Sequence, residues 1–203
     1  MKKVKVGTRS VVPSKIVCVG RNYVEHIDEL GNEIPENLVI FLKPNSAISE
    51  ELQSFHEESL HYEGELCFLF EKGRFSAVAF GLDLTKRDLQ SRLKVKGLPW
   101  ERAKAFDGSA VFSPFVPIAA VHPSLALELA IDGGQMQAGD ISLMMYKPDT
   151  ILAEISTFMT LEDGDIVMTG TPKGVGMIKA GEVFTGKVMQ EGRVITEGRW
   201  RAR

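Results

Sequence analysis

The chain has 203 residues, of which 44% are hydrophobic and 25% are charged, and its formal net charge is −3 at pH 7. This length is enough for a substantial core, and the scattered Lys and Arg residues argue against a nucleic-acid-binding protein. No apolar stretch reaches the roughly 18 residues of a membrane span, and the first six residues lack the apolar region of a signal peptide. We therefore expect a soluble, cytoplasmic protein that does not bind membranes.

Short strand-like runs outnumber helical ones along the chain. The apolar patterns predict strands over residues 15–19, 39–42, 66–70, 75–84, 116–121, 125–131, 166–169 and 183–188. Helices are predicted over residues 22–30, 85–94 and 150–158, and Gly31 follows the first of them in the position of a C-terminal cap. Cys18 and Cys67 lie in apolar runs and are expected to be core residues rather than a disulfide. The predicted fold class is α+β with strands dominant.

Two glutamates, Glu63 and Glu65, precede a run over residues 66–70 that is apolar at every position, as is typical of a strand buried on both faces. Side chains alternate along a strand, so both carboxylates are expected on one face. Like charges at the edge of a core need either raised pKa values or a cation between them, and a hard ion such as Mg²⁺ suits carboxylates. The alternative is a solvated strand end at which both glutamates face water.

Four other polar residues become candidate site residues if a metal binds between Glu63 and Glu65. Asp83 is a lone acid in an apolar strand pattern, and it is either a third metal ligand or a cap for the helix predicted from Thr85. His26 and Glu29 are three residues apart in a predicted helix, where they either form a dyad with His26 as general base or lie on a solvated face. Lys104 either stabilises an oxyanion or is an ordinary exposed lysine.

The glycine-rich stretch 169–176 does not match a phosphate-binding loop, because it contains neither G-x-x-x-x-G-K-[ST] nor G-x-G-x-x-G. Two interpretations stay open for it. The stretch is either a turn lining a substrate site, with the Thr171 hydroxyl or backbone N–H groups facing an anionic group, or a plain glycine turn.

Seven separated segments carry a combined signal that no single motif gives. They are 17–23 (VCVGRNY), 41–44 (FLKP), 61–66 (HYEGEL), 82–90 (LDLTKRDLQ), 96–100 (KGLPW), 104–107 (KAFD) and 164–176 (GDIVMTGTPKGVG). Together with His26 and Glu29, and in this order, they resemble the fumarylacetoacetate hydrolase family, above all its short acylpyruvase and oxaloacetate decarboxylase branch. The resemblance runs from about Ser14 to Val188. The connection between Glu71 and Gly81 departs from the family pattern, since it is shorter and lacks the usual helix.

The resemblance implies a β-rich mixed-sheet roll of the fumarylacetoacetase C-terminal type with few short helices. It also implies one catalytic domain over residues 1–203 and a homodimer. The family's Mg²⁺ or Mn²⁺ ion would be held at Glu63, Glu65 and Asp83. Its catalytic residues correspond to His26 and Glu29, on a lid, and to Lys104 beside the metal, and its substrate-binding residues correspond to Arg21, Arg87, Gln90 and Thr171.

The reaction that the resemblance implies is Mg²⁺-dependent hydrolysis of the C–C bond of 3-acylpyruvates, such as fumarylpyruvate, through a metal-bound pyruvate enolate. Alternatives that use the same electron sink are oxaloacetate decarboxylation, keto–enol tautomerisation and isomerisation of a 2-hydroxy-dienedioate. A non-enzymatic protein that binds a metal and a 2-oxo acid is disfavoured, because the acids and the dyad are all present. The sequence identifies neither the 2-oxo acid nor the native metal.

Overall fold

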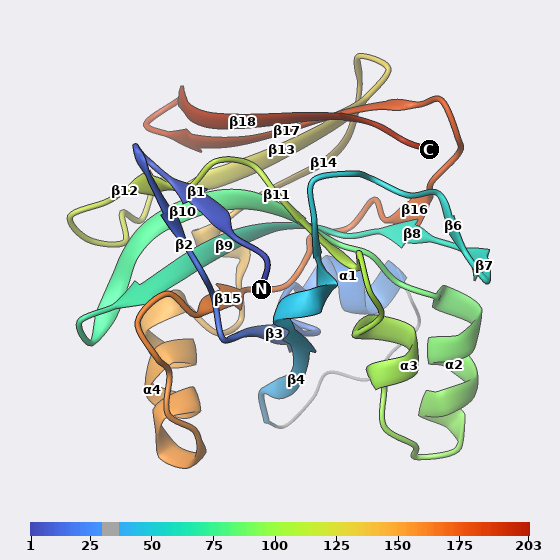
Figure 1. Ribbon diagram of the computed structural model, residues 1–203, viewed down its shortest axis with the longest axis horizontal. Coiled ribbons are helices and arrows are strands. Elements are labelled where there is room, and N and C mark those ends of the chain that lie inside the picture. The colour runs from blue at the N-terminus through green and yellow to red at the C-terminus, as the bar shows by residue number, and fades with distance from the viewer. Residues whose placement is uncertain (30–36) are drawn as a thin grey trace.

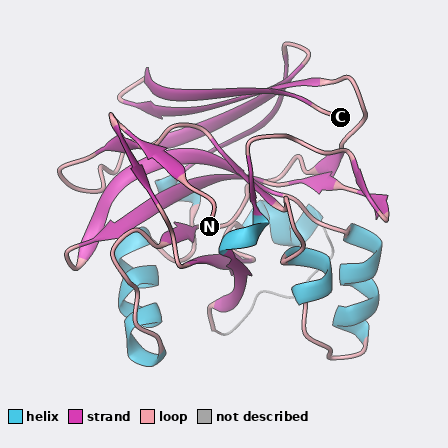
Figure 2. Ribbon diagram, in the orientation of Figure 1, coloured by secondary structure: helices cyan, strands magenta, loops and turns pink. Residues whose placement is uncertain are grey.

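Two β-sheets face each other, and helices α2 (Arg87–Val95), α3 (Glu101–Lys104) and α4 (Pro148–Phe158) lie at the opposite end of the molecule from the smaller sheet (Figure 1). The computed structural model describes residues 1–29 and 37–203, and the side chains of residues 26–28 are also outside the description. Strands dominate and helices are few and short, which confirms the predicted α+β class (Figure 2). Within the described ranges, no helix combines the length and apolar character that a membrane crossing requires.

The strands are β1 (Val4–Val6), β2 (Arg9–Val11), β3 (Lys15–Gly20), β4 (Val39–Pro44), β5 (Ile48–Ser49), β6 (Phe55–His56), β7 (Glu58–Ser59), β8 (His61–Tyr62), β9 (Gly64–Glu71), β10 (Arg74–Asp83), β11 (Ala110–Phe112), β12 (Val116–Pro117), β13 (Ala126–Ile131), β14 (Gly134–Asp140), β15 (Ile166–Met168), β16 (Gly176–Met177), β17 (Val183–Gln190) and β18 (Arg193–Arg201). The helices are α1 (Val24–Glu29), α2 (Arg87–Val95), α3 (Glu101–Lys104) and α4 (Pro148–Phe158), with 3-10 turns η1 (Asn45–Ala47) and η2 (Ile141–Leu143).

The larger sheet has eight strands and is mixed. Seven follow the order β4-β3-β15-β9-β10-β11-β5, and β12 pairs with β10. Strand β15 is parallel to β3 and β5 is parallel to β11, whereas the other pairs are antiparallel. The smaller sheet has the order β14-β13-β17-β18 and is antiparallel. The β9–β10 hairpin therefore lies in the interior of the larger sheet.

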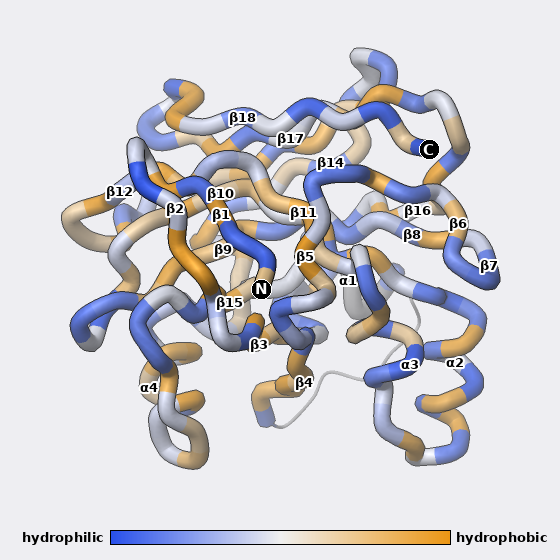
Figure 3. The backbone as a smooth tube through the Cα atoms, viewed as in Figure 1, coloured by the Kyte–Doolittle hydropathy of each residue, from blue (hydrophilic) through white to orange (hydrophobic). Residues whose placement is uncertain are grey.

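The cores on the two faces of the larger sheet draw on alternate residues of the same strands. Phe68 and Phe80 belong to the core between the sheets, whereas Cys67 and Ala79 belong to the core on the opposite face. Close packing between the sheets needs a glycine in β17, because a Cβ on Gly186 would lie 2.2 Å from the Phe80 ring. Hydropathy follows this arrangement, since the β6–β7 hairpin at the periphery is mainly hydrophilic and the interior strands are richer in hydrophobic residues (Figure 3). Cys18 and Cys67 are buried and not in a disulfide, as predicted.

Most predicted elements are confirmed, with shifted ends. The predicted strand over residues 116–121 is wrong beyond Pro117, because only β12 forms there. The first predicted helix forms over Val24–Glu29, and the expected cap at Gly31 lies outside the described residues. The short connection after Glu71 is a tight turn between β9 and β10 without a helix, with Lys72 and Gly73 both at positive φ.

A buried carboxylate, Asp165, fastens the start of β3 to the start of β15. Its Oδ1 accepts from the backbone N–H groups of Ser14 and Lys15 at 3.0 and 3.1 Å and from the Ser14 hydroxyl at 2.7 Å. Its Oδ2 accepts from Lys15 Nζ at 2.5 Å and from the Glu162 N–H at 2.9 Å. Burial alone would raise the pKa of Asp165, but the hydrogen bonds from Lys15 and Ser14 outweigh it and lower the pKa.

We expect Asp165→Asn to lower the free energy of unfolding by about 2–4 kcal/mol at pH 7, since the amide leaves buried donors without a charged acceptor. A depressed carboxyl pKa stabilises the fold above the unfolded-state pKa of about 3.9, and this stability is lost as pH falls through the folded-state pKa. Urea unfolding of both proteins from pH 7 to pH 3 should therefore show the difference shrinking in acid. The exposed Asp149→Asn control should stay near wild type. A difference independent of pH would contradict this role.

Candidate metal and substrate site

Three carboxylates converge at the open end of the β9–β10 hairpin. Glu63 precedes β9, Glu65 is two residues further on, and Asp83 ends β10 opposite Glu63, whose carbonyl accepts from the Asp83 N–H at 2.9 Å. Strand alternation and the hairpin register bring one oxygen from each of the three within 4.8 Å of one another. All three side chains are buried, so the solvated strand end is ruled out. Asp83 does not cap α2 either, because the residue at the cap position is Lys86.

Two buried lysines and an arginine lie against these carboxylates. Lys104 Nζ is 2.9 Å from Glu63 Oε2, 2.8 Å from Asp83 Oδ2 and 2.6 Å from the Thr85 hydroxyl oxygen. Lys43 Nζ is 2.8 Å from Asp83 Oδ1 and donates to the Lys104 carbonyl. Arg87 donates to Glu63 Oε1. Lys104 is therefore at the centre of the site and is not the exposed lysine of the alternative interpretation.

Glu65 is almost completely buried, with 1% of its surface exposed. Burial, and then the charges of Asp83 and Glu63, raise its pKa well above the usual value. A divalent cation among the carboxylates would remove the repulsion that raises it. The cluster offers only carboxylate oxygens, which are the ligands preferred by Mg²⁺ and Mn²⁺. These residues therefore fit the metal that the sequence predicts.

The glycine-rich stretch 169–176 closes one side of the site. The Gly170 N–H donates to Glu65 Oε2 at 2.7 Å. Gly170 has φ +96°, and a Cβ there would lie 2.9 Å from Asn22 Cβ and 3.1 Å from the Val19 carbonyl oxygen, so the close approach needs a glycine. This stretch therefore packs directly against the carboxylate cluster, and its role in lining a substrate site stays a prediction.

Thr171 lines a pocket that also reaches Glu63 and Glu65, but its hydroxyl already has hydrogen-bond partners within the protein. It donates to the Gly64 carbonyl at 2.9 Å and lies 2.8 Å from Gln137 Nε2. The Gln137 Oε1 in turn accepts from the Gly64 N–H at 2.9 Å. Thr171 and Gln137 thus hold the glycine-rich loop against the start of β9.

Helix α2 forms the opposite wall. Arg87 Nη1 donates to Gln90 Oε1 at 2.9 Å, and both residues line a pocket that reaches Glu63 and Glu65. Arg21 comes to this pocket from the end of β3, where its φ of +57° places it in a conformation rare for an L-residue with a side chain. Strained backbone of this kind clusters at functional sites.

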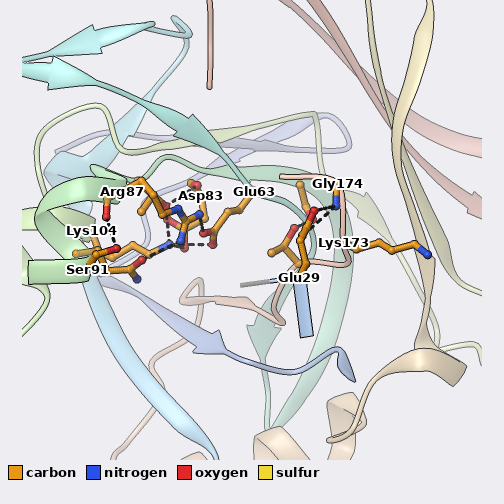
Figure 4. A network of polar contacts seen from close by, with 12 residues as sticks. Glu29, Glu63, Asp83, Arg87, Ser91, Lys104, Lys173 and Gly174 are labelled. Carbon is orange, nitrogen blue, oxygen red and sulfur yellow. Dashed lines mark hydrogen bonds and ion pairs between the residues drawn. The ribbon is translucent and has the colours of Figure 1, made fainter. Parts of the chain in front are cut away.

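Glu29 lies across the site from Arg87 and Lys104 (Figure 4). Its carboxylate accepts from the Gly174 N–H at 3.0 and 3.2 Å, and Glu25 pairs with Lys173 at 3.0 Å. Helix α1 is thereby fastened to the glycine-rich loop. The His26 side chain lies outside the described residues, so the His26–Glu29 dyad stays a prediction.

The structure adds four residues for which the sequence predicts no role. Lys43 and Gln137 hold Asp83 and the glycine-rich loop in place, and Lys94 and Trp100 line the pocket. Lys43 could have been noticed as a lysine in an apolar strand pattern, and Lys94 follows Arg87 and Gln90 at helical spacing. Gln137 lies in a polar, glycine-containing stretch that gave no signal.

Comparison with known proteins adds independent findings. The family described as fumarylacetoacetate (FAA) hydrolase C-terminal matches residues 15–197. Oxaloacetate tautomerase YcgM of Escherichia coli (strain K12) is 40% identical over 190 residues, or 85% of this chain and 87% of that protein. A mitochondrial oxaloacetate tautomerase of Arabidopsis thaliana is 41% identical over 189 residues, or 85% of each protein. The crystal structure of fumarylpyruvate hydrolase from Pseudomonas aeruginosa with Mn²⁺ and pyruvate is similar at 32% identity and a TM-score of 0.89, covering 99% of this chain and 95% of that one.

We expect Mg²⁺ or Mn²⁺ at 100 times its Kd to raise the free energy of unfolding by about 2.7 kcal/mol, since only the folded chain assembles the three carboxylates. Glu65→Gln should abolish this gain while leaving the metal-free protein as stable as wild type, because the amide is neutral. Thermal unfolding with metal and with EDTA measures both effects. Glu154→Gln, an exposed carboxylate on α4, should keep the full gain. An undiminished gain in Glu65→Gln would exclude Glu65 as a ligand.

Proposed function

Since the chain belongs to the fumarylacetoacetate hydrolase family, we propose that it is a metal-dependent oxaloacetate keto–enol tautomerase. The observation that carries this proposal is the cluster of three buried carboxylates, two of which, Glu63 and Glu65, line a pocket together with Arg87, Gln90 and Lys104. Such a site can take the carboxylate and keto oxygens of a 2-oxo acid. The two relatives named oxaloacetate tautomerase, at 40% and 41% identity, support oxaloacetate as that acid.

Glu63, Glu65 and Asp83 are the residues that would hold the metal. When bound there, Mg²⁺ or Mn²⁺ supplies a Lewis acid that favours negative charge on the keto oxygen of a 2-oxo acid. Mg²⁺ as the resident ion, a homodimer and a cytoplasmic location are further parts of this proposal, supported by the sequence alone.

Lys104 would stabilise the oxygen on which charge develops. Burial alone would lower its pKa, but Asp83 and Glu63 outweigh burial and raise it, so the ammonium group stays charged at neutral pH. Its three N–H groups are directed at Glu63, Asp83 and Thr85, so it would act on the substrate oxygen through a fixed positive charge in a water-poor site. Arg87 and Gln90, joined by their own hydrogen bond, would orient the substrate carboxylate.

The proton balance of tautomerisation is simple. The C3–H bond breaks, the C2=C3 double bond forms, and the keto oxygen at C2 gains a proton, so the net change in protons is zero. We assign removal of the C3 proton to His26, supported by Glu29, which lies across the site from Lys104 (Figure 4). No water molecule has to attack, which distinguishes this reaction from hydrolysis.

Hydrolysis of 3-acylpyruvates is the second candidate and was the main expectation from the sequence. It is supported by the similarity to fumarylpyruvate hydrolase. It ranks below tautomerisation, because that protein is 32% identical and the two tautomerases are 40% and 41% identical. Decarboxylation of oxaloacetate would use the same pocket.

The three reactions differ in products, so one set of assays separates them. We expect the purified protein with Mg²⁺ to speed the equilibration of enol and keto oxaloacetate, followed by ultraviolet absorbance, and to lose this activity in EDTA. Release of CO₂ and pyruvate from oxaloacetate would assign the protein as a decarboxylase instead. Cleavage of acetylpyruvate to acetate and pyruvate, without faster equilibration of oxaloacetate, would assign it as a hydrolase.

Lys104→Met should lower kcat for the tautomerisation by about 10²–10³-fold, since the fixed positive charge beside the developing oxyanion is removed. Metal affinity should not fall, because a competing cation leaves the carboxylates. Steady-state kinetics and calorimetric metal titration measure the two effects. Lys179→Met, at an exposed lysine, is the control. A kcat within a factor of two of wild type would remove Lys104 from the mechanism.

A further inference from the structure

We propose that Lys94, together with Arg21, binds the second carboxylate of the substrate, so that the site selects dicarboxylic 2-oxo acids over monocarboxylic ones. This inference rests on the proposed function only in taking a 2-oxo acid to be the ligand. Neither the sequence motifs nor the carboxylate cluster gives Lys94 a role. Three observations point to Lys94, namely its place on α2, the surroundings of its side chain and the charges that meet there.

Lys94 continues a line of polar residues along α2. Arg87, Gln90 and Lys94 are spaced i, i+3 and i+7, so they share one face of the helix, and all three line the pocket. At 1.5 Å per residue, Lys94 lies about 6 Å beyond Gln90 along the helix axis, further from Glu63 at the helix start. A substrate held by Arg87 and Gln90 at one end would reach Lys94 with its other end.

Lys94 and Val95 are adjacent on α2, and folding stability alone would favour burying the valine and exposing the lysine. Lys94 is half-buried against the pocket, whereas Val95 beside it is 89% exposed. Exchanging such positions would bury apolar surface and release a charge to water, which favours folding. A local arrangement that opposes folding is expected where a site needs the charge. Trp100 borders the same pocket, with its ring centre 5.8 Å from Lys94 Nζ.

Positive charge also gathers at this end of the pocket. Burial, and then the charges of Arg21 and Arg87, lower the pKa of Lys94 to about 8, so the three cations lie close enough to repel one another. The charge of Glu63 acts on Lys94 in the opposite direction, and Glu63 also pairs with Arg87 and Lys104. A divalent metal would add further positive charge. An incoming anion is therefore stabilised at Lys94, most strongly as a hydrogen-bonded carboxylate.

This arrangement distinguishes the substrates of the candidate reactions by their charge. Oxaloacetate carries a second carboxylate that can reach the outer end of α2, whereas acetylpyruvate ends in a neutral acyl group. The predicted class is thus 2-oxo acids with a second, terminal carboxylate, and it includes unsaturated diacids as well as oxaloacetate.

The test compares two 2-hydroxy acids that differ in the second carboxylate, L-malate and L-lactate, as ligands of the Mg²⁺-loaded protein by calorimetry at pH 7. Wild type should bind malate at least about 10-fold more tightly than lactate, as expected for one charge-assisted contact. Lys94→Met should weaken malate by about 10-fold and change lactate by less than about 2-fold, whereas Lys94→Arg should keep most of the preference. Lys96→Met removes an exposed lysine just beyond the same helix and should behave as wild type.

Equal weakening of malate and lactate in Lys94→Met, or no weakening of either, would overturn the proposal. The unfolding temperature and Mg²⁺ affinity of Lys94→Met show whether this variant has a folding defect. If it has, Lys94→Gln, whose side chain stays polar, is used in its place. Because malate binding needs no turnover, the outcome is separable from the proposed function. If the protein has no tautomerase activity but its preference for malate is lost in Lys94→Met, this inference stands and the proposed function does not.

Discussion

The repulsion among three buried carboxylates is the constraint on which the rest of the site depends. Glu63, Glu65 and Asp83 meet within 4.8 Å at the edge of a well-packed core, where water cannot screen them. The polar groups around the cluster offset this repulsion, and this accounts for features that sequence composition alone does not explain. The buried Lys43 and Lys104 carry the charge that Asp83 requires, and the Gly170 N–H reaches Glu65. The site is thus a set of mutually dependent charges, which explains why lysines are tolerated at positions with almost no exposure.

Such a cluster needs a rigid frame, and the two sheets supply it. The tight turn between β9 and β10, together with the β-bulge between Phe75 and Ala77, sets the hairpin register that places Asp83 opposite Glu63. The hairpin is held on one face by the smaller sheet, where Gly186 admits the Phe80 ring, and on one side by β15, whose start is anchored through Asp165. A shift of one residue in the register would turn the carboxylates to the other face of the sheet. The precision of the site is therefore set by strand pairing rather than by loops.

How much of the site could be predicted from the sequence depends on how far apart along the chain the interacting residues lie. Side-chain alternation is local, so the shared face of Glu63 and Glu65 is readable from the sequence, as is the strand that follows. Asp83 joins them only through the hairpin register, and from local sequence it could equally have capped α2. The burial of Lys43 depends on tertiary neighbours that no local pattern specifies. Strands β14 and β18 were missed because residues such as Gln137, Arg193 and Arg199 give them a polar pattern, and pairing rather than apolar periodicity defines them.

The division of the pocket into two ends also explains how one family site can serve several reactions. In the proposed reactions, the carboxylate cluster, Lys104 and Arg87 would act on the part of the substrate that tautomerisation, decarboxylation and hydrolysis have in common, so these residues would not distinguish the reactions. Lys94 and Trp100 line the same pocket further along α2, where they would meet the part in which the substrates differ. Coulomb attraction weakens slowly with distance in a water-poor site, so a cation there alters binding of a diacid much more than of a neutral acyl chain. On this proposal, the charge at the end of α2, rather than the metal, would decide which 2-oxo acids the site accepts.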